Sequence, residues 1–271
     1  SQFLPHPLFL SAALGRMPSV IVVEWIVFTG CSGLIFAYFM WKYRLSMETD
    51  RTERRRHGMI NDAIRLREGW VMQVLSNKSE ALLAVQTFRN VLMAATFLAS
   101  VALVLASSLI SMATDSARSD KIHSITRKDP IVAALHKEGD VKVVDATIKI
   151  FVAALVTFMS FFAFTNSIRY HVHLGFFMHT LAFRENDSDA RKERNMALAN
   201  EYIRMGHKSF ALGIRICYCF LPFCMWLLGP TALLVSSVLL VVVLFRMDSV
   251  GNTQQEFFEG RRCSSEAHTP L

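Results

Sequence analysis

The sequence has little charge for its length. Only 19% of its 271 residues are Asp, Glu, Lys or Arg, whereas soluble domains usually carry about 25%. These charges are crowded into the connecting segments and the two ends, and four long stretches contain almost none. This distribution is typical of an integral membrane protein. The net charge of +7 therefore indicates topology signals and headgroup contacts rather than nucleic-acid binding.

The chain also lacks the motifs of familiar catalytic classes. It contains no HExxH, no GxSxG, no P-loop and no GxGxxG, which are the usual signatures of metalloproteases, hydrolases and nucleotide enzymes. Its five cysteines form no CxxC pair and no zinc-type spacing. We therefore predict a protein that is not an enzyme and has no cofactor or metal, although a bound phospholipid is compatible with the pattern.

The charge-poor stretches predict an all-α integral membrane bundle of four transmembrane helices with additional amphipathic interfacial helices. We expect the spans at about 19–41, 91–113, 146–165 and 216–245. Together they form a membrane domain of residues 19–248, flanked by an N-terminal extension (1–18) and an extended, polar C-terminal arm (249–271). Lys149, near the start of the third span, is expected to snorkel to a membrane face.

The last apolar stretch is ambiguous because it holds 30 uncharged residues, from Ile216 to Phe245. One span needs about 20 residues and two need about 40. We therefore interpret it as one long helix, tilted or kinked at Gly229-Pro230. A re-entrant hairpin that turns at Gly229-Pro230 is the alternative.

Lys and Arg are distributed unevenly between the two sides of this four-span topology. The first and third loops with their flanks contain 18, against 11 for the other loop and the two ends. This bias places the first and third loops on the cytoplasmic or matrix side. With an even number of spans, both termini face the opposite side.

Three segments resemble a known family. They are REGWVMQVLSNKSEALLAVQTFRNVLMAATFLAS (67–100), NSIRY (166–170) and FALGIRICYCFLPFCMWLLGP (210–230). They are similar to an integral membrane protein family of bacteria and plants defined by a domain of unknown function, number five-nine-nine. The resemblance extends over about 20–248. It implies a four-span membrane fold and implies no activity.

Six residues at the ends of the predicted spans are candidates for binding a lipid headgroup or another anion. They lie near one membrane face in this topology, where a basic pocket suits anionic lipids. Ordinary snorkelling with hydrogen bonds between helices is the alternative. The six residues are Arg89, Asn90, Asn166, Arg169, Arg215 and Tyr218.

Histidines and acids provide little evidence for other sites. His171, His173 and His179 are clustered, but no predicted span contains a histidine. We therefore do not expect a haem held by histidines of facing helices. We expect instead that these histidines lie at the membrane interface. Glu24 is the only acid within a predicted span, and a proton relay would need a chain of such groups.

We therefore predict a structural or accessory membrane subunit that acts through helix packing and lipid contacts. Its expected partners are membrane lipids, including anionic ones, and other subunits of a hetero-oligomer. The favoured assembly is an energy-transducing one, a mitochondrial respiratory complex or ATP synthase, which would place the chain in the mitochondrial inner membrane. The alternatives are a small-solute or ion transporter and a plasma or other organelle membrane.

Overall fold

The computed structural model describes residues 20–51, 66–71, 73–74, 81–135, 143–182 and 189–266. All regular elements in these ranges are helices. Their bounds are α2 (Val20–Arg51), α4 (Ala81–Ala113), α5 (Ser116–Arg127), α6 (Pro130–Leu135), α7 (Ala146–Ala182), α8 (Asp189–Met225) and α9 (Pro230–Glu266). The predicted N-terminal extension lies outside the described residues. The predicted C-terminal arm is not extended, because α9 continues through Glu266.

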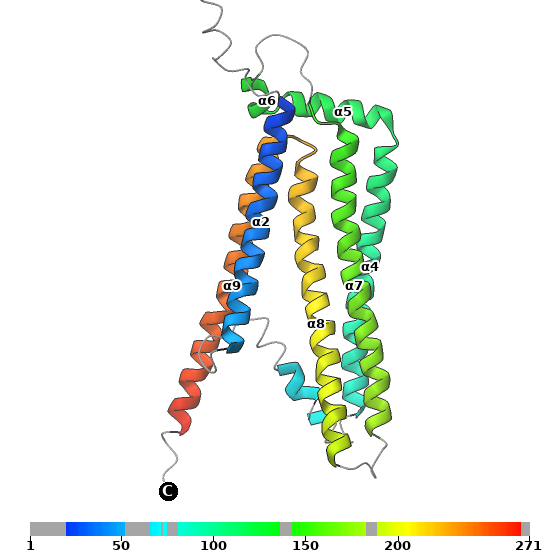
Figure 1. The fold of residues 1–271 in the computed structure, drawn as a ribbon, viewed down its shortest axis with the longest axis vertical. Helices are drawn as coiled ribbons and strands as arrows, with labels where there is room; N and C mark the ends of the chain where they lie inside the picture. The colour runs from blue at the N-terminus through cyan, green and yellow to red at the C-terminus, as the bar shows by residue number, and fades with distance from the viewer. Residues whose placement is uncertain are drawn as a thin grey trace, which may run out of the picture.

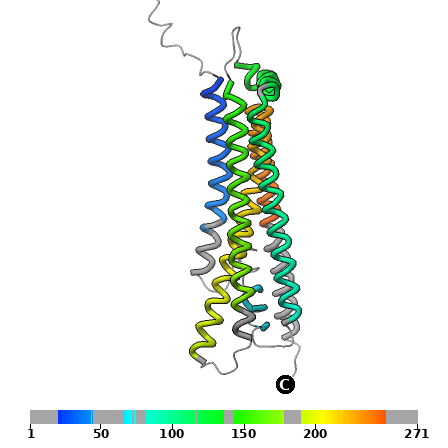
Figure 2. Tube along the Cα trace, turned by 90° about the vertical axis from the view of Figure 1, so that its right-hand side faces the viewer, coloured from blue at the N-terminus to red at the C-terminus, as the bar shows by residue number. Residues whose placement is uncertain are grey.

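The long helices run side by side in two groups (Figures 1 and 2). Helices α4, α7 and α8 pack together, and α2 pairs with α9. The short helices α5 and α6 lie across one end of the molecule, which we call the α5/α6 end. The opposite end, where α4 and α8 begin, is called the far end.

Five described helical segments are long and apolar enough to cross a membrane. They are Val20–Lys42, Leu82–Ala113, Ala146–Phe177, Ala190–Met225 and Pro230–Asp248. The predicted class, an all-α membrane bundle, is confirmed. The structure has five candidate spans instead of four, because the single span predicted at 216–245 is divided between α8 and α9.

The division occurs at a tight turn after Met225. Gly229 has φ +148°, a backbone conformation that side chains with a Cβ rarely adopt. Pro230 follows as the first residue of α9, where its missing N–H costs no helical hydrogen bond. The chain therefore reverses at Gly229-Pro230 between two full helices, and neither the kinked span nor the short re-entrant hairpin forms.

The length that two spans require comes from the residues before Ile216. Helix α8 begins at Asp189 and contains Lys208 and Arg215, which the count of uncharged residues had excluded. Long basic side chains can keep their charge at a polar edge while their stems lie along apolar surface. The count of uncharged residues therefore underestimated the length of helix available.

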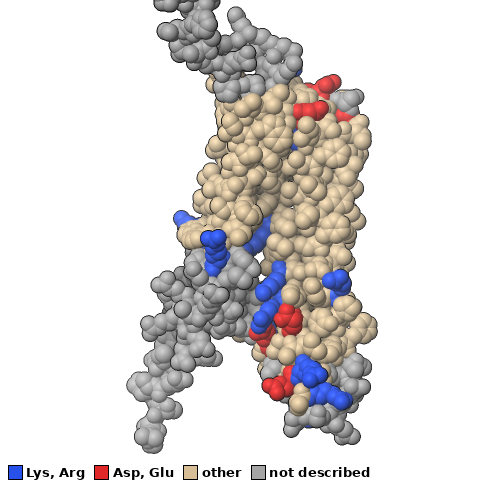
Figure 3. Space-filling view, in the orientation of Figure 1, with Lys and Arg blue, Asp and Glu red and all other residues tan. Residues whose placement is uncertain are grey.

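A fifth span changes the predicted sidedness of the C-terminal segment. Helix α9 runs from the α5/α6 end towards the far end, on the side of the first and third predicted loops (Figure 1). The count of Lys and Arg then becomes 21 towards the far end against 8 towards the α5/α6 end. Figure 3 shows the same bias: Asp and Glu are visible at the α5/α6 end, a broad face below it shows almost no charge, and most of the visible Lys and Arg lie lower. This stronger bias favours a cytoplasmic or matrix location for the far end.

Helices α4, α7 and α8 are longer than the hydrocarbon core of a membrane is thick, as are α2 with 32 residues and α9 with 37. Helix α4 has 33 residues, and α7 and α8 have 37 each, or about 50 to 55 Å, against a hydrocarbon core of about 30 Å. Their far ends enclose a separate apolar cluster with the helical segment 66–74. Its buried members are Val71, Val74, Ala84, Phe88, Leu174, Ala199 and Ile203. The amphipathic segments expected from the sequence therefore pack under the membrane part of the bundle.

Candidate functional site

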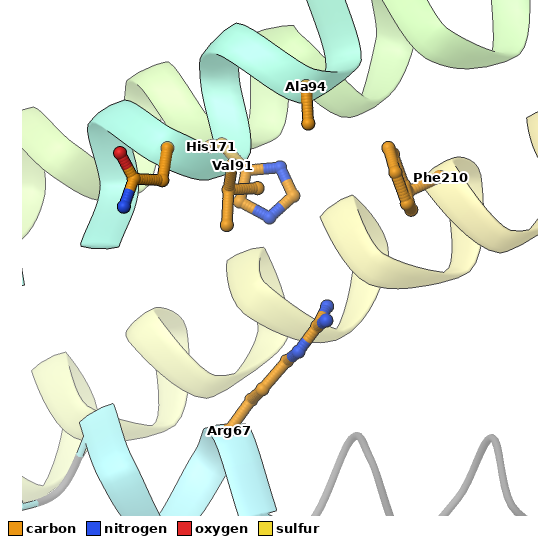
Figure 4. Close-up of a pocket in the computed structure, with 6 residues that line it drawn as sticks. Arg67, Val91, Ala94, His171 and Phe210 are labelled. Atoms are coloured by element: carbon orange, nitrogen blue, oxygen red, sulfur yellow. The ribbon is translucent and has the colours of Figure 1, made fainter. Parts of the chain in front are cut away.

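A cavity with a mostly apolar lining and one charged residue lies where the helical segment 66–71 meets α4, α7 and α8. It has a volume of about 290 Å³. Its lining residues come from all four of these elements (Figure 4). They are Arg67, Asn90, Val91, Ala94, His171 and Phe210.

Close packing of α7 on α8 positions His171. Gly206 permits the approach, because a Cβ added there would lie 2.6 Å from the imidazole. The Ser167 hydroxyl donates a 2.8 Å hydrogen bond to the Gly206 carbonyl oxygen. The His171 Nδ1 donates to the Ser167 carbonyl oxygen at 2.8 Å, because a carbonyl oxygen can only accept. The ring orientation and the protonated nitrogen are therefore both defined.

Arg67 supplies the positive charge of the cavity. Its side chain reaches from its own helix towards the cavity wall formed by α7 and α8 (Figure 4). The guanidinium donates to Nδ1 of His207, a buried residue of α8. Burial lowers the pKa of Arg67 from its usual value, yet an arginine side chain stays charged in proteins. His207 is thus a neutral acceptor in this contact.

The described residues around Arg67 offer no carboxylate to balance its charge. None of the residues that line the cavity is acidic, and no ion pair joins Arg67 to an acid within the described part of the chain. Glu68, the adjacent acid, pairs with Arg204 of α8 at 2.9 Å. The lining formed by the described residues therefore carries one positive charge, that of Arg67, which favours an anion.

The cavity lies at the depth of lipid headgroups. Asn90 is about 35 Å along α4 from Ala113, and His171 is about 38 Å along α7 from Ala146. A hydrocarbon core of about 30 Å that begins near the α5/α6 end finishes just before this level. The cavity therefore faces the interfacial layer at the far end.

The six residues predicted to bind a headgroup do not form one site. Asn90 lines the cavity, and its neighbour Arg89 is exposed. Asn166 donates to the Ser209 hydroxyl at 3.0 Å. Arg169 is exposed, with its guanidinium 5.3 Å from the centre of the Tyr170 ring. These four residues belong to the side of the bundle formed by α4, α7 and α8.

Arg215 and Tyr218 lie at a different junction, between α2, α8 and α9. The Arg215 guanidinium is 3.9 Å from the Asp248 carboxylate, which also accepts a 2.7 Å hydrogen bond from the Tyr38 hydroxyl. Tyr218 packs against the apolar cluster that includes Ile35. This group joins three helices, and lipid contact at all six residues stays a prediction.

A second ionic site lies near the α5/α6 end. Lys149 and Glu24 are 1% and 0% exposed, with Nζ 3.1 Å from Oε1. The other Glu24 oxygen accepts the Val144 N–H at 2.8 Å, and the ammonium lies 5.5 Å from the centre of the Trp226 ring. The prediction that Lys149 snorkels to a membrane face is therefore wrong. The side chain points towards α2, where a carboxylate compensates the cost of burying the ammonium.

Two residues of these sites, Arg67 and His207, were not predicted from the sequence. Arg67 belongs to a strongly basic connecting segment. The sequence therefore gives no reason to prefer it over the other arginines of that segment as a ligand. The candidate spans are longer than the predicted ones and include His171 and His207, and the level of the cavity agrees with the expectation of interfacial histidines. His207 was missed because the helix lengths were underestimated. The described residues contain no group of three or more His, Cys, Asp or Glu placed to hold a metal ion.

These features define an integral membrane helical bundle with a positively charged cavity at the level of the lipid headgroups. Residues 32–253 match the family described as "Protein of unknown function, DUF599". The chain belongs to this family, which confirms the resemblance seen in the sequence. The match gives no number of membrane spans. No curated protein matches the chain, and no solved structure matches it.

Proposed function

We propose that the chain is a non-catalytic accessory subunit of a larger membrane assembly, in which it acts through helix packing and lipid contacts. The main support is the outward face of α4. Ser100, Ser107 and Ser108 are exposed there, and each hydroxyl bonds to a backbone carbonyl of its own helix at 2.8 to 2.9 Å. Small residues with satisfied hydroxyls allow a second helix to approach closely within a membrane. These three serines therefore mark a place where a neighbouring helix could pack against α4.

The assembly that we favour is an energy-transducing complex of the mitochondrial inner membrane. The resembled family occurs in bacteria, and a membrane of bacterial descent is a natural place for such a chain. The plasma membrane and other organelle membranes are the alternatives. Co-migration with respiratory or ATP-synthase subunits is the outcome that supports this choice.

The first experiment is native electrophoresis of gently solubilised membranes, with mass spectrometry of the band that contains the chain. The proposal expects a band much larger than 30.7 kDa that contains other membrane subunits. Ser107→Trp should move the chain out of that band, because the bulky ring keeps a neighbouring helix away from α4. Leu155→Trp is the matched control, since Leu155 is an exposed apolar residue of α7. A chain that migrates alone before any substitution contradicts the proposal.

The Glu24–Lys149 pair is the observation that favours a second candidate function, a small-solute or ion transporter. Ionisable groups within a span often mark a transport path. Reconstitution of the purified chain in liposomes tests this alternative. A flux that Glu24→Gln abolishes would support transport, whereas the accessory role expects no flux from either the natural chain or the variant.

A further inference from the structure

Arg67, the one charged residue that lines the cavity, has no oppositely charged partner among the described residues. Arg67 is half-buried and its guanidinium carries five N–H donors, one of which is directed at His207. A buried or partly buried cation is costly unless an anion or strong acceptors compensate for the lost hydration. A neutral imidazole is an acceptor and carries no opposite charge. Among the described residues, no group supplies a negative charge that would compensate Arg67 in the cavity.

The walls of the cavity differ in polarity along the membrane normal. Arg67, Asn90 and His171 form the polar part towards the far end, and Ala94 and Phe210 extend the lining towards the α5/α6 end. Ala94 is exposed on α4, which leaves this side accessible from the membrane. A group with a negatively charged oxygen cluster and an attached apolar part matches this arrangement.

The type of donor selects among anions. The planar guanidinium of arginine matches the spacing of two oxygens on one phosphorus, and it binds phosphate through two parallel N–H···O bonds. The Asn90 amide adds a neutral donor on the opposite helix. Chloride offers no such pair of oxygens and gains less from this geometry.

We propose that the cavity binds a phosphate group, with Arg67 as the charged ligand and Asn90 as a second donor. The phosphate belongs either to the headgroup of an anionic phospholipid or to free phosphate in solution. This site deepens the lipid-contact part of the proposed function and rests on that part alone. It does not require the chain to belong to a larger assembly.

Binding is measured on the purified full chain in a neutral maltoside detergent after removal of native lipid. The probes are micelles with added dioleoyl phosphatidylglycerol, micelles with added dioleoyl phosphatidylcholine, and inorganic phosphate compared with chloride at equal ionic strength. The readouts are the increase in thermal unfolding temperature and the Kd from its dependence on probe concentration. Phosphatidylglycerol or inorganic phosphate should stabilise the natural chain, with phosphatidylcholine and chloride giving a much smaller effect.

Four variants separate a phosphate site from general attraction of anions. Arg67→Gln should raise the Kd about tenfold to a hundredfold, because it removes a charge-assisted bidentate contact. Arg67→Lys should retain part of the affinity, since it keeps the charge and loses the paired donors. Asn90→Leu should raise the Kd several-fold, and its exposed position makes folding insensitive to the change. Arg194→Gln is the matched control, because it removes one positive charge from an exposed side chain of α8 that does not line the cavity.

The outcomes distinguish the two sources of phosphate. Stabilisation by inorganic phosphate alone, lost in Arg67→Gln, identifies free phosphate as a ligand. Stabilisation that needs phosphatidylglycerol and disappears in the same variant identifies a lipid headgroup. The proposal is overturned if no probe acts more strongly than its control, or if Arg194→Gln weakens binding as much as Arg67→Gln. If Arg67→Gln does not fold, unchanged affinity in both Arg67→Lys and Asn90→Leu also overturns it. A purified chain that binds phosphate but migrates alone on the native gel refutes the accessory role and leaves this site intact.

Discussion

Asp129 connects the starts of two helices that are far apart in the sequence, through its contact with Thr231. Its carboxylate accepts the Thr231 hydroxyl at 2.7 Å and the Thr231 N–H at 3.0 Å, while also accepting the Ile131 N–H at 2.9 Å. One buried side chain thus caps α6 and α9 together. This contact holds the reversal between α8 and α9 against the α5/α6 end.

Asp129→Ala should therefore lower the free energy of unfolding by about 2 to 3 kcal/mol, because it removes the caps of both helices and leaves buried donors unpaired. Asp115→Ala is the matched control, since Asp115 caps only α5 and is more exposed. We expect about 1 kcal/mol from that control. Chemical denaturation in detergent, followed by circular dichroism, measures both. Equal losses in the two variants would show that the contact with α9 adds no stability.

The Glu24–Lys149 pair predicts strong coupling between the two positions. Either Glu24→Gln or Lys149→Met alone should cost about 3 to 5 kcal/mol, because each leaves one buried charge without its partner. The double variant should recover most of this loss, since a neutral pair needs no compensation. A double-mutant cycle on unfolding in detergent measures the coupling. Additive losses would contradict a direct interaction.

The pH dependence of stability should include a small contribution from Asp145, which lies just before α7. The Thr147 N–H, 2.8 Å from its carboxylate, lowers the pKa of Asp145 below its usual value. Because the folded-state pKa is lower, the stabilisation is complete above the unfolded pKa of about 3.9. It is lost as the pH falls through the folded pKa.

The Asp145 side chain is 58% exposed, so solvent screening limits its effect to well under about 1 kcal/mol. Asp145→Asn provides the control, because asparagine also caps a helix but does not titrate. Unfolding temperatures of both proteins between pH 6 and pH 3 measure the difference. The natural chain should lose more stability than the variant over this interval, and parallel curves would exclude the contribution.

The odd number of spans predicts which exposed residues share a side of the membrane. The test starts from a variant in which the native cysteines are replaced. One new cysteine is then introduced at Asp120 of α5 or at Glu193 of α8, both of which are exposed. The two new cysteines should react with an impermeant maleimide from opposite sides of oriented vesicles. A tag after residue 271 should be accessible from the same side as Glu193. The four-span topology instead places such a tag on the Asp120 side. Shared accessibility of the tag and position 120 would therefore refute the fifth span.

The candidate site was only partly predictable from the sequence. The reasoning placed polar residues at the far ends of the spans, and Asn90 does line the cavity. It did not place Arg67, because the contact with His207 joins residues that are 140 positions apart. It also grouped Arg215 with the lipid-facing residues, whereas the return of α9 brings Asp248 next to it.

The sequence by itself determined the helical membrane class, the family and the approximate position of the first span, at 19–41 against Val20–Lys42 in the structure. These properties depend on the local lengths of apolar stretches, since about 20 apolar residues suffice to cross a bilayer. Only the tertiary structure decided that the last stretch is a reversal between two helices. That reversal depends on Gly229 meeting Asp129, which lies 100 positions earlier in the sequence. The pairing of Lys149 with Glu24 likewise depends on the packing of α7 on α2, because burial of a charge is tolerated only where the fold brings its partner.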